Sequence, residues 1–370
     1  MLALVAFLGA THLSASGAVA LGDNAELFLT GSASVTFDDN IFLSSNSNAR
    51  VDDTIYTFAP GLDLVFGRNS QTTGNIYYRH DILRYVDRDV QNTDLANFGL
   101  NSLYNNGKTK FDFGGSFNQT AQNDPVVPGT IVERDAKRLR AIAEFGVSEK
   151  MTIGVGLRYE NYDYALSLFR DSRNWTAPID IYYEYSPKLQ ISAGYRFRET
   201  NVSHGVDSRD HFFNIGARGE FTPKLIGQIR VGYTTRNYLG TGNDDGRLGA
   251  DANLTYSYSE KTSVFIGFSN DYGTSAIGET TEDSAFNIGV TSRVDEQWSW
   301  TAQLAYRSTD YFSRSDDYYQ GSLGAAYRYS ENLSFSANYT HRRNNSDSMI
   351  VGQDLSFRNN LFSLAANIRY

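Results

Sequence analysis

Arginine is the residue type through which this chain could do most of its chemistry. The 370 residues include 26 arginines and only seven lysines, and six of the lysines lie at or beside short polar turns. A guanidinium is always charged and binds carboxylates and sulfates through two hydrogen bonds at once. Nine arginines fall on the polar face of alternating segments, and together they could guide an anionic polymer or solute: Arg138, Arg140, Arg158, Arg196, Arg198, Arg230, Arg236, Arg307 and Arg342.

A second interpretation of these arginines is purely structural. Acidic residues occur on the same polar face, and Arg–carboxylate pairs between neighbouring strands would simply neutralise the charges of a water-facing wall. Both interpretations stay open, because a register slip of one residue would turn every side chain to the other face. The acidic residues concerned are Glu144, Glu160, Asp180, Glu184, Glu220, Asp251 and Asp271.

Signals for catalysis are poor. The pairs His80-Asp81 and Asp210-His211 are sequence neighbours, and neighbours on a strand point to opposite faces, so neither pair forms a dyad by itself. The chain has no cysteine, no G-x-S-x-G motif and no histidine spacing typical of a metal site. We therefore predict no catalytic residues, no metal site and no cofactor, and we expect that the protein is not an enzyme.

The elements that must hold the arginines are alternating strands, and the last one is the clearest. From residue 362 onward apolar and polar residues alternate to the final position, so one strand carries an apolar face and a polar face. A last strand of this kind that ends on an aromatic residue resembles the carboxy-terminal signal of bacterial outer-membrane barrels, which the barrel-assembly machinery recognises. The apolar face, which would form this signal, comprises Phe362, Leu364, Ala366, Ile368 and Tyr370.

Eighteen alternating segments can be marked, and the joints between them are of two kinds. Short joints built on Ser, Thr, Asp, Pro and Lys recur with steps of 38, 36, 37, 36 and 35 residues between Lys150 and Asn332. Longer polar joints alternate with them, at 38–53, 122–135, 201–208, 239–246 and 346–354. We expect segment 122–135 to be too short to reach far across the lumen.

This pattern predicts an all-β fold, a transmembrane outer-membrane β-barrel of about 18 antiparallel strands. Short periplasmic turns and longer extracellular loops are typical of such barrels, as are aromatic girdles, and the chain has 25 Tyr and 23 Phe. Sixteen strands would follow if the weak segment near 93–104 is misread. A soluble sandwich is disfavoured, because it would need fewer regularly spaced hairpins.

The first twenty residues read as a secretory signal peptide. An apolar core at 2–9 is followed by Ala18-Val19-Ala20, an Ala-x-Ala cleavage site. No later stretch approaches the ~18 apolar residues of a spanning helix. We therefore expect residues 21–370 to form one barrel domain integrated in outer-membrane lipid of a Gram-negative cell. The net charge of -9 argues against a nucleic-acid partner.

The first hairpin carries the most specific motif. Its signature Phe37-Asp38-Asp39-Asn40-Ile41-Phe42 is followed by an Asp-initiated strand at 52–56 and a Pro-Gly-Leu at 60–62. This stretch resembles the β-barrel porin family found with exopolysaccharide-biosynthesis operons, with Phe37 where that family has Tyr. The motif covers roughly residues 30–85.

The resemblance implies an outer-membrane channel for exopolysaccharide export. The transported substrate would be a polysaccharide, and a periplasmic polysaccharide-export protein would be the partner. The family supplies no catalytic residues. Two alternatives stay open, a general or anion-selective porin for small solutes and a surface structural or adhesive barrel.

Overall fold

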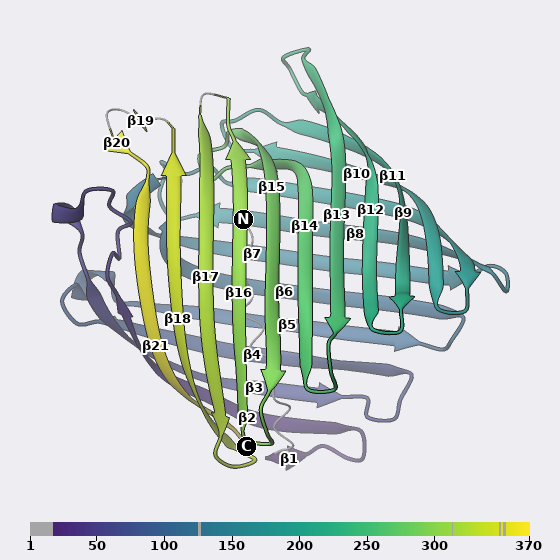
Figure 1. Cartoon of the computed structure of the whole chain (residues 1–370), viewed down its shortest axis with the longest axis horizontal. Helices are drawn as coiled ribbons and strands as arrows, with labels where there is room; N and C mark the ends of the chain where they lie inside the picture. The colour runs from purple at the N-terminus through teal and green to yellow at the C-terminus, as the bar shows by residue number, and fades with distance from the viewer. Residues whose placement is uncertain (1–17, 125–126, 313, 348, 351–352) are drawn as a thin grey trace.

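The computed structural model is a single closed barrel of antiparallel strands (Figure 1). It describes residues 18–124, 127–312, 314–347, 349–350 and 353–370. Eighteen strands form the wall, as the sequence predicts, and the segment at 93–105 is one of them, which excludes the sixteen-strand alternative. Within the described ranges no helix is long and apolar enough to cross a membrane.

The wall is made of β2 to β18 and β21. Their bounds are β2 Ala25–Asp38, β3 Asp53–Phe66, β4 Thr72–Tyr85, β5 Thr93–Asn105, β6 Thr109–Asp124, β7 Val127–Gly146, β8 Met151–Tyr164, β9 Ser172–Ser186, β10 Leu189–Val202, β11 Ser208–Thr222, β12 Leu225–Tyr238, β13 Asp244–Ser257, β14 Thr262–Thr274, β15 Thr280–Arg293, β16 Trp298–Asp310, β17 Ser315–Arg328, β18 Leu333–Ser346 and β21 Phe357–Arg369. Smaller elements are β1 Val19–Ala20, β19 Met349–Ile350, β20 Gln353–Asp354 and the 3-10 turns η1 Ser47–Ala49 and η2 Asp89–Gln91.

Each strand pairs with its sequence neighbours, and β21 pairs with β2 to close the wall. Short turns gather at the lower end of Figure 1 together with β1 and the C-terminus, and the longer connections gather at the upper end. We call the upper end the mouth. The predicted signal peptide lies outside the described residues except for its last three positions, where β1 pairs with β2.

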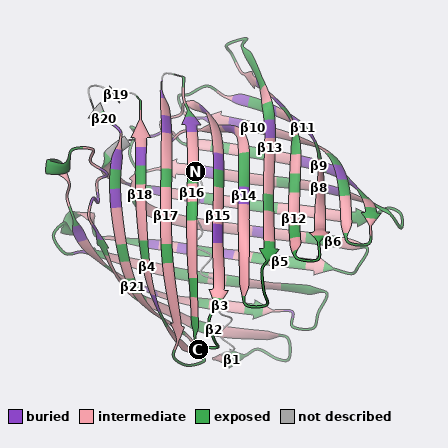
Figure 2. Cartoon of the chain, in the orientation of Figure 1, coloured by how far each residue is buried: buried purple, intermediate pink, exposed green. Residues whose placement is uncertain are grey.

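Strand register sorts side chains into an apolar outer belt and a polar inner wall. Phe286 faces Tyr306 and Ile288 faces Leu304 across β15 and β16, and Leu304 is 64% exposed. In a water-soluble protein such large apolar side chains would be buried, so this belt requires a lipid surface. Buried residues instead gather toward the mouth, as the purple segments in the upper part of Figure 2 show.

The short turns use side-chain acceptors to hold the chain reversal. In the turn between β15 and β16, the backbone N–H groups of Trp298 and Gln297 donate to the Asp295 carboxylate over 2.7 and 2.8 Å. These two donors hold the pKa of Asp295 below its usual value of 3.8. This is the local hydrogen bonding that the recurring Ser, Thr and Asp residues predict.

The strands at the two ends of the sequence close the barrel. Phe37 faces Phe362 and Val35 faces Leu364 on the outer side, and the backbones of Leu29 and Tyr370 exchange hydrogen bonds of 2.7 and 2.8 Å. The outer face of β21 therefore carries the residues of the predicted assembly signal at the seam that completes the wall.

The first-hairpin motif fastens the same seam at the mouth. Asp39 accepts hydrogen bonds from the backbone N–H (2.6 Å) and the side-chain amide of Asn360 on β21, and Asp38 accepts from the Asn359 amide. Asn40, which is fully buried, donates to the carbonyl of Arg358 over 2.9 Å. The polar motif residues thus act on the fold, because they join segments more than 300 positions apart.

The structure corrects the prediction of a long polar loop at 122–135. β6 continues to Asp124 and β7 begins at Val127, so most of this segment is a long hairpin rather than a loop. The β-branched residues Val127, Ile131 and Val132 favour extended backbone, which explains the continuation. Gly129 donates its N–H to the carbonyl of Phe42 over 2.7 Å, so the hairpin reaches the connection between β2 and β3.

Candidate constriction site

A row of polar side chains crosses the inner wall over six consecutive strands. Each member is the direct register partner of the next, from β7 to β12, so their side chains share one face. Four of the six are arginines, and all four were predicted from alternation. The row, which we call the cationic row, comprises Arg140, Arg158, Thr176, Arg198, Asp210 and Arg236.

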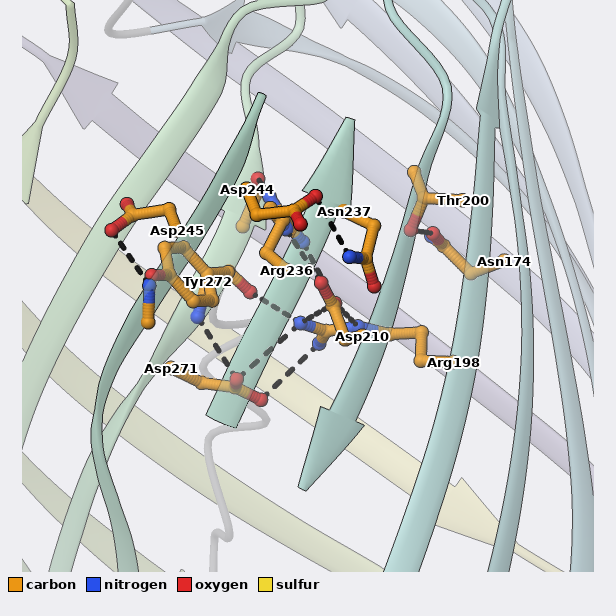
Figure 3. Close-up of polar contacts among 12 residues, drawn as sticks. Asn174, Arg198, Thr200, Asp210, Arg236, Asn237, Asp244, Asp245, Asp271 and Tyr272 are labelled. Carbon is orange, nitrogen blue, oxygen red and sulfur yellow. Dashed lines mark hydrogen bonds and ion pairs between the residues drawn. The ribbon is translucent and has the colours of Figure 1, made fainter. Parts of the chain in front are cut away.

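Asp210 sits between two arginines at the centre of a buried network (Figure 3). Its carboxylate accepts from Arg236 Nε at 2.6 Å and Nη2 at 2.8 Å, and from Arg198 Nε at 2.6 Å. Asp210 and Arg236 are each 1% exposed. Two cations around one carboxylate leave a net positive charge, which a further carboxylate compensates.

That further carboxylate belongs to Asp271 on β14, four strands away from β10. Asp271 lies 2.7 Å from Arg196 Nη2 and 3.2 Å from Arg198 Nη1. The backbone carbonyls of Tyr272 and Gly273 accept from Arg198 and Arg236 at 3.0 and 3.1 Å. Three arginines of β10 and β12 therefore hold the mouth end of β14 against the inner wall.

The mouth ends of β14 and β15 turn toward the lumen, although they stay paired with each other and β15 stays paired with β16 from Glu282 onward. Alternation from Phe268 puts Tyr272 on the outer face of β14, yet its buried ring packs on the inward guanidiniums of Arg236 and Arg247, 4.6 and 5.4 Å away. Glu282, on the outer face of β15, likewise forms an ion pair of 2.9 Å with Arg247 of β13. We call residues 271–282 the tucked end.

The connections above the tucked end pack together at the mouth. Val132, Phe169 and Ala276 form a buried apolar cluster with Tyr164 at its margin, and Arg170 donates its N–H to the carbonyl of Ala276 over 2.8 Å. These residues come from the β6–β7 hairpin and from the connections after β8 and β14. We call Val132, Tyr164, Phe169 and Ala276 the mouth cluster. Through Val132 the β6–β7 hairpin therefore contacts the connection after β14.

The other predicted arginines are spread along the inner wall. Arg138 pairs with Glu160 at 3.6 Å, Arg140 with Asp112 at 2.8 Å and Arg230 with Asp251 at 3.0 Å. Arg342 donates to Asn359 and lies 3.9 Å from Asp38, and Arg307 stacks on Tyr318 at 5.4 Å. Arg158 has no ion pair or hydrogen bond to the described residues, and its charged neighbours are Arg230, Arg140, Glu160 and Asp180. Seven of the nine are therefore ion-paired.

The opposite part of the inner wall carries an uncharged row. Its members are again direct register partners, on β16, β17, β18, β21 and β2. Hydroxyl and amide groups replace the ions here, and Thr36 donates to the Ser363 hydroxyl over 3.0 Å. This row is therefore neutral, although the same strands carry the inward Arg307 and Arg342 nearer the mouth. The uncharged row comprises Thr301, Gly324, Asn338, Ser363 and Thr36.

A hollow of about 470 Å³ opens near the short-turn end of the strands that carry the cationic row. Arg218 of β11 spans it to bind Glu144 of β7 through two bonds of 2.7 and 2.9 Å, and also stacks on Tyr182. Lys110 and Lys188 line the same space. This bond joins strands four apart, so the wall must bend sharply between them.

Two residues of the network were missed by the sequence reasoning. Asp210 was considered only beside His211, although folding a hairpin about residue 204 would have placed it opposite Arg198. Tyr272 carried no signal, because its burial depends on the inward displacement of β14. Asp210 and His211 do face opposite ways, and His211 contacts the Tyr195 hydroxyl at 2.7 Å. No group of metal ligands occurs among the residues that the structure describes.

Comparison with known proteins agrees with this geometry. The model of the family described as "Putative beta-barrel porin 2" matches residues 203–294, which span β11 to β15 and include Asp210, Arg236 and Asp271. The match supports a β-barrel porin family, as the sequence predicts. Together with the closed wall and its apolar belt, the match supports a porin-like β-barrel of the outer membrane.

Solved structures similar to this barrel include OccAB4, the outer membrane protein OpdK and a variant of a receptor. OccAB4 of Acinetobacter baumannii is 10% identical, with a TM-score of 0.49, over 94% of this chain and 99% of that one. OpdK of Pseudomonas aeruginosa is 8% identical, with a TM-score of 0.48, over 94% and 99%. A variant of the ferric enterobactin receptor PfeA of Pseudomonas aeruginosa is 9% identical, with a TM-score of 0.46, over 92% and 80%. No curated protein matches the sequence.

Proposed function

We propose that this chain is an outer-membrane porin for small polar solutes. The observation that carries the proposal is the closed 18-stranded wall whose inner face has both a cationic and an uncharged row. Barrels of 16 to 18 strands enclose an aqueous channel. The tucked end and the mouth cluster occupy part of that channel, so the solutes that pass are small.

The ion pairing of the lumen bears on selectivity. Because seven of nine inward arginines have a carboxylate partner, their positive charge is largely compensated within the wall. Arg158 and Arg307 are the two of the nine without a carboxylate partner among the described residues. Arg307 stacks on Tyr318, which leaves Arg158, with Asp180 near it, to act on a passing anion. We therefore expect a general porin with weak anion preference rather than a strongly anion-selective one.

Reconstitution of the full chain into lipid vesicles and planar bilayers tests this function. Vesicles should swell with neutral monosaccharides, more slowly with disaccharides and hardly at all with larger oligosaccharides. A salt gradient should give a small reversal potential, and Arg158→Ala should move it toward cation preference. Protein-free and heat-denatured samples are the controls. A folded barrel that gives neither swelling nor conductance would refute the proposal.

Exopolysaccharide export is the second candidate. It is favoured by the motif that resembles porins of exopolysaccharide operons and by the uncharged row, whose hydroxyl and amide groups suit a hydroxyl-rich polymer. A periplasmic polysaccharide-export protein would then be the partner. Deleting the gene separates the candidates. Loss of surface polysaccharide with normal uptake of small solutes would support export, whereas slowed uptake with normal polysaccharide would support the porin. A barrel that only displays its loops would change neither.

A further inference from the structure

The wall of the barrel is incomplete at one seam. β13 and β14 pair from Ser257↔Ser263 up to Ala250↔Asn270, and there the pairing stops. β13 nevertheless continues to Asp244, paired only with β12, and forms a hairpin that projects above the barrel in Figure 1. β14 continues to Thr274, paired only with β15. Two strand edges that begin side by side are thus left apart on the mouth half of the wall.

These two edges have matching registers. Continuing the observed pairing by four residues would place Gly249 opposite Asp271, Leu248 opposite Tyr272, Arg247 opposite Gly273 and Gly246 opposite Thr274. Leu248 would then share the outer face with Tyr272 and with Phe268 below it. Unpaired backbone groups at a strand edge are unfavourable, and another strand can bind there. The nearest strand of correct register is the end of β14 itself.

The end of β14 stays paired with β15, but along its other edge side chains take the place of the missing ladder with β13. Asp271 is bound by Arg196 and Arg198, and the carbonyls of Tyr272 and Gly273 accept from Arg198 and Arg236. All three arginines belong to the inner face of β10 and β12. One set of interactions therefore competes directly with the other, because β14 cannot lie against β12 and pair with β13 at once.

We propose that the tucked end, residues 271–282, is a gate that moves between two seats. In the latched seat it lies against Arg196, Arg198 and Arg236 and narrows the lumen. In the zipped seat residues 271–274 pair with residues 246–249 of β13, which completes the wall and widens the passage. The effect of the gate on conductance rests on the proposed channel function, whereas the two positions of residues 271–282 do not. A switch requires two well-defined conformations of this kind.

The absence of cysteine from the chain makes a disulfide test clean. In the variant Leu248→Cys with Tyr272→Cys, the two thiols face each other in the zipped seat, within disulfide distance for directly opposed residues. In the latched seat position 272 lies against the inner wall and position 248 points to lipid. We expect the disulfide to form in the folded, lipid-inserted barrel and to raise its conductance. A reductant should return the conductance to its original value.

A charge variant tests the latch from the other side. Asp271→Asn removes the ionic bonds to Arg196 and Arg198 and should lower the ratio of latched to zipped molecules by about tenfold. Its matched control is Glu199→Gln, which removes an Arg–carboxylate pair on the outer face of β10 and β11, Glu199 with Arg209 at 3.0 Å. We expect the mean single-channel conductance to rise for Asp271→Asn and to stay unchanged for Glu199→Gln.

The outcomes separate the gate from the porin function. Disulfide formation is measured by mass spectrometry and needs no conduction, so it can support the gate even if the barrel carries no current. If the thiols of the double variant stay reduced in the folded barrel under an oxidant, the zipped seat does not exist and the gate is refuted. Unchanged conductance of Asp271→Asn in a conducting barrel would also overturn it.

Discussion

At the scale of single residues, charge burial distinguishes the inner wall from the outer one. Asp210 carries the bonds of both Arg198 and Arg236 and is almost inaccessible. Removing its charge leaves Arg236 without a carboxylate partner and Arg198 with Asp271 alone. An unpaired buried charge is far more costly than a lost surface pair. The importance of Asp210 therefore comes from its neighbours rather than from any chemistry of its own.

We expect Asp210→Asn to lower the free energy of unfolding by about 3 kcal/mol. Glu199→Gln, on the adjacent pair of positions but facing outward, should cost less than about 1 kcal/mol, because its ion pair is exposed. Urea unfolding in lipid vesicles, followed by tryptophan fluorescence, measures both. Equal effects of the two substitutions would show that the network around Asp210 does not stabilise the barrel.

At the scale of one strand, the two faces differ in the solvent they meet. On β16, Leu304 points outward and is 64% exposed, while its neighbour Gln303 points to the lumen. Both positions lie near the middle of the strand, far from either rim. The same substitution at the two positions therefore compares lipid with lumen in one element.

Leu304→Arg should cost about 2–4 kcal/mol, the value for a cation on the lipid face near the bilayer midplane. Gln303→Arg should cost far less, because the charge enters the aqueous lumen. The fraction folded as a function of urea in lipid vesicles checks both. If Gln303→Arg proved the more harmful, the assignment of the two faces would be wrong.

At the scale of the whole molecule, the mouth cluster connects distant parts of the barrel. Val132, Phe169 and Ala276 come from three connections, and Phe169 is buried while the adjacent Leu168 is 60% exposed. Connections that are held to one another keep the passage narrow at the mouth. Weakening the contacts between these connections should therefore change both the hydrogen exchange of their backbone amides and the conductance of the barrel.

Phe169→Ala should remove about 3 kcal/mol of local stability at the mouth, whereas Leu168→Ala should change little. We expect faster hydrogen exchange at residues 129–132 and 275–279 and a higher conductance for the first variant alone. Mass spectrometry of exchanged peptides gives the first readout and planar bilayers the second. Unchanged exchange in Phe169→Ala would mean that the cluster does not hold the mouth together.

The sequence by itself determined the wall. A period of two fixes which residues share a face, and the alternating short and long joints fix the order of strands, because hairpin pairing is local. The last strand and the first-hairpin motif were both recognisable as patterns, although only the structure shows that Asp39 binds Asn360 across the closing seam. Strand number, topology and the inward face of the arginines all follow from such local rules.

Only the tertiary structure decided how the lumen is filled. Asp271 reaches Arg196 four strands away, and the ring of Tyr272 packs on the guanidinium of Arg236. Phe169 contacts Ala276 at the mouth. These contacts depend on where the wall bends and where the pairing of β13 and β14 ends. Alternation contains no information on either, because it specifies the face of each residue but not the shape of the closed sheet.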